Sequence, residues 1–298
     1  MTLSRPMIGH LAMLGFSVLI SFSFTFGGMI AGEIDPGVLT LLRFTIASTV
    51  LACVAMLNRV SLMGVMRRAW AWLLIGGLFA AYFITMFEAL SLTTPLATSA
   101  LFTLTPLIAA GFGFVLLGLR PGSAMLAATL LGGFGALWVI FRADLQQLLA
   151  LRLGPGEKLF LMGVMAHAAV PALTRRLAPG ASSLEAALGT SLGSLVVTAA
   201  YAMPQTLLTD FSLLRPMVWF VALYLGVVTT AITFFLLQTA IARISPGKVM
   251  AYTYLLPSLV LVQGLVLHGR SEPAQIYWGV GVTLIALALL VFQDRQKA

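Results

Sequence analysis

Three ionisable side chains, Arg43, Glu88 and His167, lie inside long apolar runs of the sequence. If these runs cross a membrane, such groups are costly to bury and mark a binding or transport site. Arg43 and Glu88 each lie near one end of a run, so we expect them to face each other as an outer gate or as an anchor for a substrate carboxylate. The alternative is a structural ion pair, or side chains that extend to the membrane surface.

His167 lies near the middle of its run, in GVMAHAAVPAL. Pro171 follows four residues later and has no N–H for the carbonyl of His167, so we expect the helix to be locally open there. An imidazole in this position would bind a substrate or relay a proton. The alternative is a neutral histidine that is hydrogen-bonded between helices.

The remaining substrate-binding candidates are hydroxyl and aromatic side chains in the same apolar runs. They are Ser17, Ser21, Tyr82, Thr103, Thr233, Tyr252 and Tyr254. Ser17, Ser21 and Thr25 recur every four residues, which gives one helix face a polar stripe suited to a pathway or to a tight helix contact. For any single hydroxyl, a bond back to its own helix is the alternative.

Other kinds of chemistry lack the residues they need. No nucleophile and base occur at a useful spacing, and no pair of metal ligands recurs at helical spacing, so we expect no enzyme, no metal and no cofactor. The net charge is +8, but Lys and Arg lie in short loops rather than on one face, which argues against nucleic acid. The single cysteine, Cys53, excludes an internal disulfide.

The composition predicts an all-α integral membrane protein. Of 298 residues, 60% are hydrophobic and 9% are charged, whereas a soluble domain has about 25% charged residues. Turn-rich breaks define ten transmembrane helices. We expect them at 11–31, 37–57, 70–90, 95–118, 122–141, 158–177, 183–202, 217–241, 246–267 and 275–292. A further surface helix would fit at 144–152.

Loop charges orient these helices. With the N-terminus inside, eleven Lys and Arg residues lie in inner segments and five in outer segments. Because basic residues favour the cytoplasmic side, both termini are expected in the cytoplasm.

The sequence also repeats itself after 151 residues. TPLATSALFTLTPL (94–107) aligns with SPGKVMAYTYLLPS (245–258), so that Pro95 matches Pro246 and Pro106 matches Pro257. The same register matches Gly113 with Gly264 and Gly118 with Gly269. We therefore expect two five-helix halves, residues 1–145 and 146–298.

Five helices are an odd number, so the second half must enter the membrane from the opposite side. Inverted repeats with helices broken at matching positions indicate a transporter with a central cavity and a binding site near mid-depth. Pro106 and Pro257 are then hinges, and Pro171 is a third break. The freed carbonyls of Phe102 and Thr253 need new partners, which irregular backbone finds only inside a protein or beside a wet cavity. Packing kinks are the alternative.

These residues resemble a known family. EALSLTTPLATSALFTLTPL, followed by GFGFVLLG, is similar to the fourth-helix signature of the drug/metabolite transporter superfamily, in its ten-helix EamA branch, and LLRFTIAS around Arg43 is similar to the second helix. Within the family the likeness is to YddG-type exporters of aromatic and other amino acids. It implies a bundle with the third, fourth, eighth and ninth helices around a central cavity, and the fifth and tenth at the periphery.

We therefore expect an exporter of small neutral or zwitterionic metabolites, amino acids including aromatic ones, that works by alternating access in a bacterial-type inner membrane. Its expected partners are the small-molecule substrate and the lipid bilayer; the oligomeric state stays open, with a monomer compatible with this arrangement. An efflux carrier for other metabolites or drugs and a passive channel or sensor are the alternatives.

Overall fold

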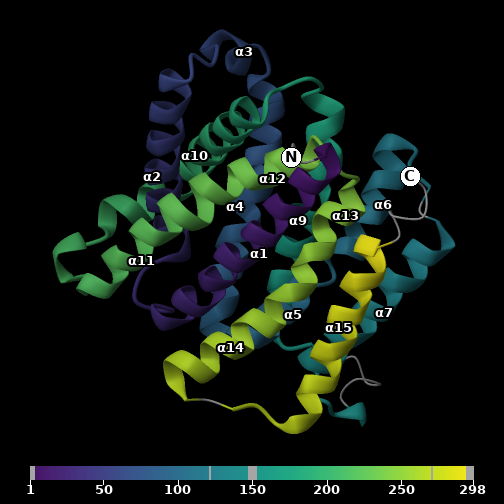
Figure 1. The fold of residues 1–298 in the computed structure, drawn as a ribbon. Helices are drawn as coiled ribbons and strands as arrows, with labels where there is room; N and C mark the ends of the chain where they lie inside the picture. The colour runs from purple at the N-terminus through teal and green to yellow at the C-terminus, as the bar shows by residue number, and fades with distance from the viewer. Residues whose placement is uncertain (1–3, 121, 147–152, 270, 293–298) are drawn as a thin grey trace.

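The computed structural model describes residues 4–120, 122–146, 153–269 and 271–292, and the described chain is helical throughout (Figure 1). The first half contains α1 (Arg5–Met29), α2 (Pro36–Leu57), a short α3 (Leu62–Arg67), α4 (Ala69–Leu92), α5 (Pro95–Phe102), α6 (Thr105–Leu117) and α7 (Ser123–Ile140). The second half contains α9 (Pro155–Leu177), α10 (Ser183–Leu208), α11 (Pro216–Gly226), α12 (Thr233–Ile241), α13 (Pro246–Ala251), α14 (Leu256–His268) and α15 (Ala274–Phe292). Three short elements complete it: η1 (Phe211–Leu213), the π-helical η2 (Val227–Ile232) and η3 (Tyr252–Leu255).

These elements reproduce the ten predicted spans. With each interrupted helix taken as one, nine helices in the described residues are long and apolar enough to cross a membrane. The tenth is α9, which has 23 residues but carries charged groups near both ends, among them Glu157 and Arg175. The first span begins earlier and the seventh ends later than predicted, at Arg5 and Leu208. The surface helix expected at 144–152 lies mostly outside the described residues.

The two halves are repeats related by an inversion. α5 packs against α14, and α6 packs against α13, so the start of each broken helix lies beside the end of the other. Gly118 and Gly269, 151 residues apart, both end a helix in the left-handed conformation, with φ of 68° and 61°. The expected periphery is also present, because α7 and α15 pack against each other at one side of the bundle (Figure 1).

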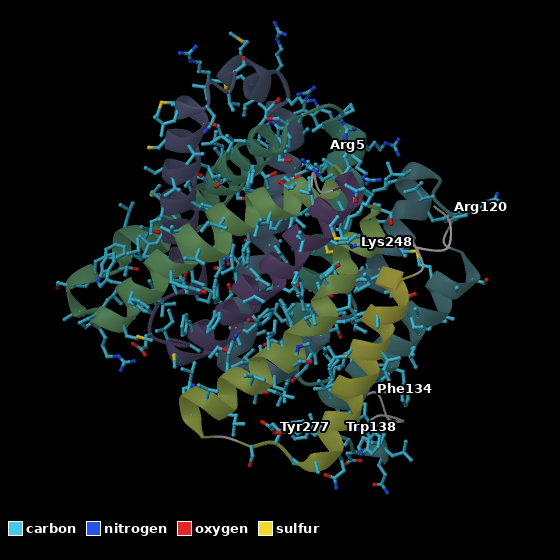
Figure 2. The ribbon with its side chains drawn as sticks, viewed as in Figure 1. Arg5, Arg120, Phe134, Trp138, Lys248 and Tyr277 are labelled. Carbon is cyan, nitrogen blue, oxygen red and sulfur yellow. The ribbon has the colours of Figure 1, made fainter. Side chains whose placement is uncertain are left out.

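The two ends of the bundle differ in the residues that they carry. Arg5, Arg120 and Lys248 lie at the end where the chain starts, whereas Phe134, Trp138 and Tyr277 lie toward the other end (Figure 2). We call these ends the N-terminal face and the opposite face. Aromatic side chains at one end of a helical bundle are typical of a membrane–water interface.

Close helix packing holds the middle of the bundle together. A Cβ atom at Gly76 of α4 would lie 2.2 Å from the backbone nitrogen of Ser194 in α10. At the next residue, Gly77, a Cβ would lie 3.7 Å from the side chain of Val197, an ordinary contact. Of these two neighbouring glycines, Gly76 is therefore the one that the approach of α4 to α10 requires.

We expect Gly76→Ala to destabilise the protein by about 1–3 kcal/mol, because the methyl group overpacks a backbone contact. Gly77→Ala is the matched control and should be neutral or stabilising, since alanine favours a helix over glycine by about 1 kcal/mol. Thermal unfolding in detergent measures both variants, and equal melting temperatures would contradict the packing.

Candidate functional site

Arg43 is fully buried in the first half of α2, where its guanidinium contacts the second half of the chain. Asp35 caps the start of α2 by accepting hydrogen bonds from the backbone N–H groups of Gly37 and Val38. The Nε of Arg43 donates to Thr230 Oγ1 at 2.5 Å, and its Nη2 donates to the carbonyl oxygen of Thr229 at 2.8 Å. The guanidinium thus joins α2 to the π-helical segment η2.

The expected ion pair between Arg43 and Glu88 is not formed, and that prediction is wrong. The guanidinium carbon of Arg43 lies 3.5 Å from the ring centre of Phe83, on the same helix as Glu88. Glu88 itself is exposed and lines a cleft of about 260 Å³ at the opposite face. The two side chains are separated because Arg43 turns inward to η2, whereas Glu88 lies on another face of α4.

An aromatic cluster fills the bundle beside Arg43. Its members are buried and come from six of the ten spans. They are Phe24, Phe44, Phe79, Tyr82, Phe83, Phe102, Phe160 and Phe234. Ring centres of neighbouring members are 4.4 to 6.5 Å apart, within the usual range for aromatic pairs.

His167 lies inside this aromatic cluster. Its ring centre is 4.6 Å from that of Tyr82, 4.8 Å from that of Phe102 and 5.2 Å from that of Phe79. The expected opening of the helix at His167 is wrong: α9 runs without interruption from Pro155 to Leu177 with Pro171 inside it. Since α9 packs closely on α4, a proline can be accommodated there without a break.

Three buried polar atoms of this site have no hydrogen-bond partner among the described residues. They are Arg43 Nη1, Tyr82 Oη and His167 Nδ1. Tyr82 lies between the other two residues: its ring centre is 4.6 Å from that of His167, in a tilted arrangement, and 4.6 Å from that of Phe83, the ring that Arg43 contacts. Buried polar atoms are nearly always paired in proteins, so three unpaired ones on neighbouring side chains make this the candidate place for the polar groups of a ligand. We call Arg43, Tyr82 and His167 the central triad.

Ser17, Ser21 and Tyr252 belong to a different network, between α1 and the broken ninth span. Ser17 Oγ donates to the carbonyl oxygen of Tyr252 at 2.8 Å, and the Tyr252 hydroxyl lies 3.0 Å from His10 Nδ1. Ser21 accepts from Gln263 Nε2 at 2.7 Å, while Thr25 donates to Gln263 Oε1 at 2.5 Å. The polar stripe of α1 is therefore a tight helix contact.

The other hydroxyl candidates also lie away from the central triad or bond within their own helices. Thr103 donates to the carbonyl oxygen of Ala100 at 2.6 Å, and Thr233 donates to that of Thr229 at 2.9 Å. Tyr254 donates to the carbonyl oxygen of Thr129 at 3.1 Å. Its ring lies on Gly132 of α7, toward the periphery.

Pro106 and Pro257 interrupt their helices as predicted, and the carbonyls that they free are bonded locally. α5 ends at Phe102, and the hydroxyl of Thr105 donates to its carbonyl oxygen. In the second half, the 3₁₀ segment η3 separates α13 from α14, and the backbone N–H of Leu256 donates to the carbonyl of Thr253. Both breaks are satisfied inside the protein, as irregular backbone in a membrane requires.

Two clefts beside these broken helices are related by the inversion. One, of about 240 Å³, lies at the opposite face between α5 and α14, and the other, of about 190 Å³, lies at the N-terminal face between α13 and α6. Six lining residues of the first match six of the second after a shift of 151. They are Thr94, Pro95, Leu96, Val260, Leu261 and Gly264, and Ser245, Pro246, Gly247, Ala109, Ala110 and Gly113.

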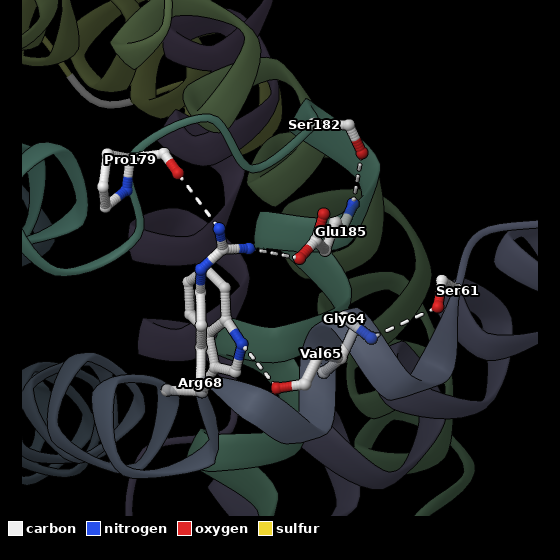
Figure 3. A network of polar contacts seen from close by, with 8 residues as sticks. Ser61, Gly64, Val65, Arg68, Pro179, Ser182 and Glu185 are labelled. Carbon is white, nitrogen blue, oxygen red and sulfur yellow. Dashed lines mark hydrogen bonds and ion pairs between the residues drawn. The ribbon is translucent and has the colours of Figure 1, made fainter.

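Among the described residues, one ion pair at each face joins the two halves. At the N-terminal face, Arg68 donates to Glu185 at 2.7 Å and to the carbonyl oxygen of Pro179 at 3.1 Å (Figure 3). At the opposite face, Arg215 pairs with Glu33, and its hydrogen bond lowers the pKa of the Glu33 carboxyl. In the first half, Glu33 lies between α1 and α2, and Arg68 lies directly before α4. Their partners in the second half are Arg215, directly before α11, and Glu185, in the first turn of α10. We call these two ion pairs the face pairs.

The sequence did not single out several of these residues. Phenylalanine is common in any membrane span, so nothing marked the phenylalanine members of the aromatic cluster. One signal was available: under the repeat register, Phe83 matches Phe234, and both belong to the cluster.

Comparison with known proteins agrees with this architecture. The profile of the EamA-like transporter family matches residues 7–141 and again residues 154–292. No curated protein sequence matches the chain. A solved structure titled "Crystal structure of protein" is 20% identical and covers 98% of both chains, with a TM-score of 0.72. At that identity the likeness shows the fold.

Proposed function

Since the chain belongs to the EamA-like transporter family, we propose that it exports small neutral or zwitterionic metabolites, amino acids including aromatic ones, by alternating access. The observation that carries this proposal is the central triad, where a buried cation and two unpaired polar atoms lie among aromatic rings at mid-depth. The cation suits a carboxylate, and the rings suit an apolar or aromatic side chain.

The orientation of the protein follows from charge. Arg5, Arg120 and Lys248 lie at the N-terminal face (Figure 2), and basic residues favour the cytoplasmic side. The proposed location is therefore a bacterial-type inner membrane with both termini in the cytoplasm, and the opposite face is the outer one.

Alternating access requires each face to open while the other stays closed. The face pairs support this, because exposed ion pairs contribute only about 0–1 kcal/mol each and can break within a transport cycle. The two related clefts support it as well, since one lies at each face beside the same two broken helices.

Counterflow tests the proposed function. Liposomes that contain the purified protein and are preloaded with unlabelled phenylalanine should take up labelled phenylalanine faster than the same liposomes without the preload. A carrier exchanges one bound substrate molecule for another across the membrane, so substrate inside speeds uptake from outside. A panel of other amino acids and metabolites, run as competitors, defines the substrate range. A channel would show flux without counterflow, and a sensor would show no flux, so either result would contradict the proposal.

The proline breaks give a further prediction. Pro106→Ala and Pro257→Ala supply the missing N–H and allow a straighter helix, so folding should be retained while counterflow slows by about tenfold, which corresponds to about 1.4 kcal/mol. Pro204→Ala, near the end of α10 and away from both breaks, is the matched control and should transport normally. Unchanged rates in both hinge variants would count against a hinge role.

A further inference from the structure

The cation of the central triad has no acid of its own. Eight of the nine Asp and Glu residues lie in the described part of the chain, and none of these eight has a buried side chain. The ion pairs that they form with arginines lie at the two faces. Arg43 is the single Lys, Arg, Asp or Glu that is buried among the described residues.

Weaker contacts take the place of that acid. Two threonines hold one edge of the guanidinium, and the ring of Phe83 lies 3.5 Å from its carbon. Aromatic faces attract cations, but less strongly than a carboxylate does. Nη1 has no partner in the described residues. A buried guanidinium with a free donor and no acid is costly by itself and well suited to an anionic ligand.

We propose that the central triad is a carboxylate site, and that the transporter accepts aromatic carboxylates without an amino group. This goes beyond the proposed function, because it adds anionic solutes to the neutral and zwitterionic ones, and it rests on the proposed transport by alternating access. Arg43 Nη1 and the hydroxyl of Tyr82 would donate to the two carboxylate oxygens, and His167 Nδ1, in its protonated tautomer, would donate a further bond. Each of these three atoms would thereby gain the partner that it lacks.

The amino group of an amino acid finds no counterpart here. An ammonium group needs a carboxylate or several carbonyl oxygens, and the described acids lie at the ends of the bundle. The ammonium group of a bound amino acid would also lie close to Arg43, and the guanidinium would repel it. A solute with a hydroxyl in place of the ammonium group avoids that repulsion and retains the carboxylate.

The aromatic cluster determines which kind of side chain the solute carries beside its carboxylate. Phe79 and Phe102 contact His167, and Phe83 covers Arg43, so a solute reaches the central triad only when these rings move aside. That movement breaks ring–ring contacts. A solute that carries its own ring replaces them, whereas an aliphatic or polar solute does not.

Three isosteric probes test this inference on the unaltered protein. Phenylalanine has both charges, phenyllactate has the carboxylate and a hydroxyl, and phenylalaninamide has the ammonium group and a neutral amide. Each is tested as an unlabelled competitor and, in labelled form, as a counterflow substrate in liposomes. We expect phenyllactate to compete at least as well as phenylalanine, and phenylalaninamide to compete at least 30-fold more weakly.

The outcomes separate the inference from the proposed function. If phenylalanine shows counterflow and phenyllactate neither competes nor moves, the inference is overturned and amino-acid export stands. Counterflow of phenyllactate alone supports the inference and overturns amino-acid export. If phenylalaninamide competes as well as phenylalanine, the site does not recognise the carboxylate group and the inference fails. If no probe shows counterflow, both proposals fail.

A variant adds a second readout. In Arg43→Met, binding of phenylalanine and of phenyllactate, measured as the rise in melting temperature that each ligand causes, should be weakened alike, whereas binding of phenylalaninamide should not be weakened. Equal weakening of all three would indicate a general packing defect and would overturn the carboxylate assignment.

Discussion

Arg43→Met should nearly abolish transport of a carboxylate substrate. Removing one partner of a buried charge pair costs about 2–5 kcal/mol, which corresponds to a loss of roughly 30- to 4,000-fold in kcat/KM at about 1.4 kcal/mol per tenfold. Methionine is unbranched and apolar, so it fills much of the same space between α2 and η2. Counterflow at several substrate concentrations measures the loss.

The same substitution should leave the fold intact or make it more stable. It removes a buried cation that has no acid partner, and replacing buried charge by an apolar side chain is often neutral or stabilising. Thermal unfolding therefore distinguishes a binding role from a structural one. A variant that transports poorly because it is misfolded would show a lower melting temperature, contrary to expectation.

Glu88→Gln is the matched control. Glu88 was the sequence-based partner of Arg43, but it is exposed and belongs to the cleft at the opposite face. Its neutralisation should change flux by about twofold or less, since exposed surface substitutions usually have effects within about 0.5 kcal/mol. Normal transport by Arg43→Met, or its loss in Glu88→Gln, would contradict the site described above.

Joining either face pair covalently should stop transport. Cysteines at positions 33 and 215, or at 68 and 185, can be linked in a background without Cys53. The reagent is a short bis-methanethiosulfonate, which forms a disulfide with each cysteine. Because each pair connects the two halves at one face, the link holds that face closed and prevents the cycle. Counterflow should fall to background and recover when a reductant cleaves the link.

The unlinked cysteine variants are the control for this experiment. Each face pair is at least partly exposed and its loss costs little, so the double-cysteine proteins should transport before reagent is added. Full transport after confirmed linkage of both faces would show that the faces do not need to separate.

Much of the fold could be predicted because membrane spans are long and locally encoded. Apolar length, loop charge and the prolines at 95, 106, 246 and 257 were enough to place the spans, the repeat and the breaks. In particular, Pro106 and Pro257 each remove one backbone donor wherever the chain folds. The helix interruptions at Phe102 and in η3 follow from that local property.

The candidate site was predicted less well because it depends on which helix faces meet. Arg43 was identified by its charge alone, but its contacts come from residues about 190 positions away, on a π-helical turn that no local pattern marked. Ser17 and Ser21 have the right spacing for a pathway, yet Ser17 bonds to Tyr252 of η3 and Ser21 to Gln263 of α14. Spacing defines a face of a helix, and only packing decides what that face contacts.

Sided labelling of two positions tests the central claim, that two inverted halves enclose one site reachable from both faces. Positions 120 and 271 are equivalent in the repeat, and the fold brings them to opposite faces. Arg120→Cys and Ser271→Cys, made without Cys53, are treated in intact cells with a thiol reagent that does not cross membranes. Only position 271 should react until the cells are permeabilised. Reaction of both positions from the same side would contradict the inverted arrangement, and with it the carrier described here.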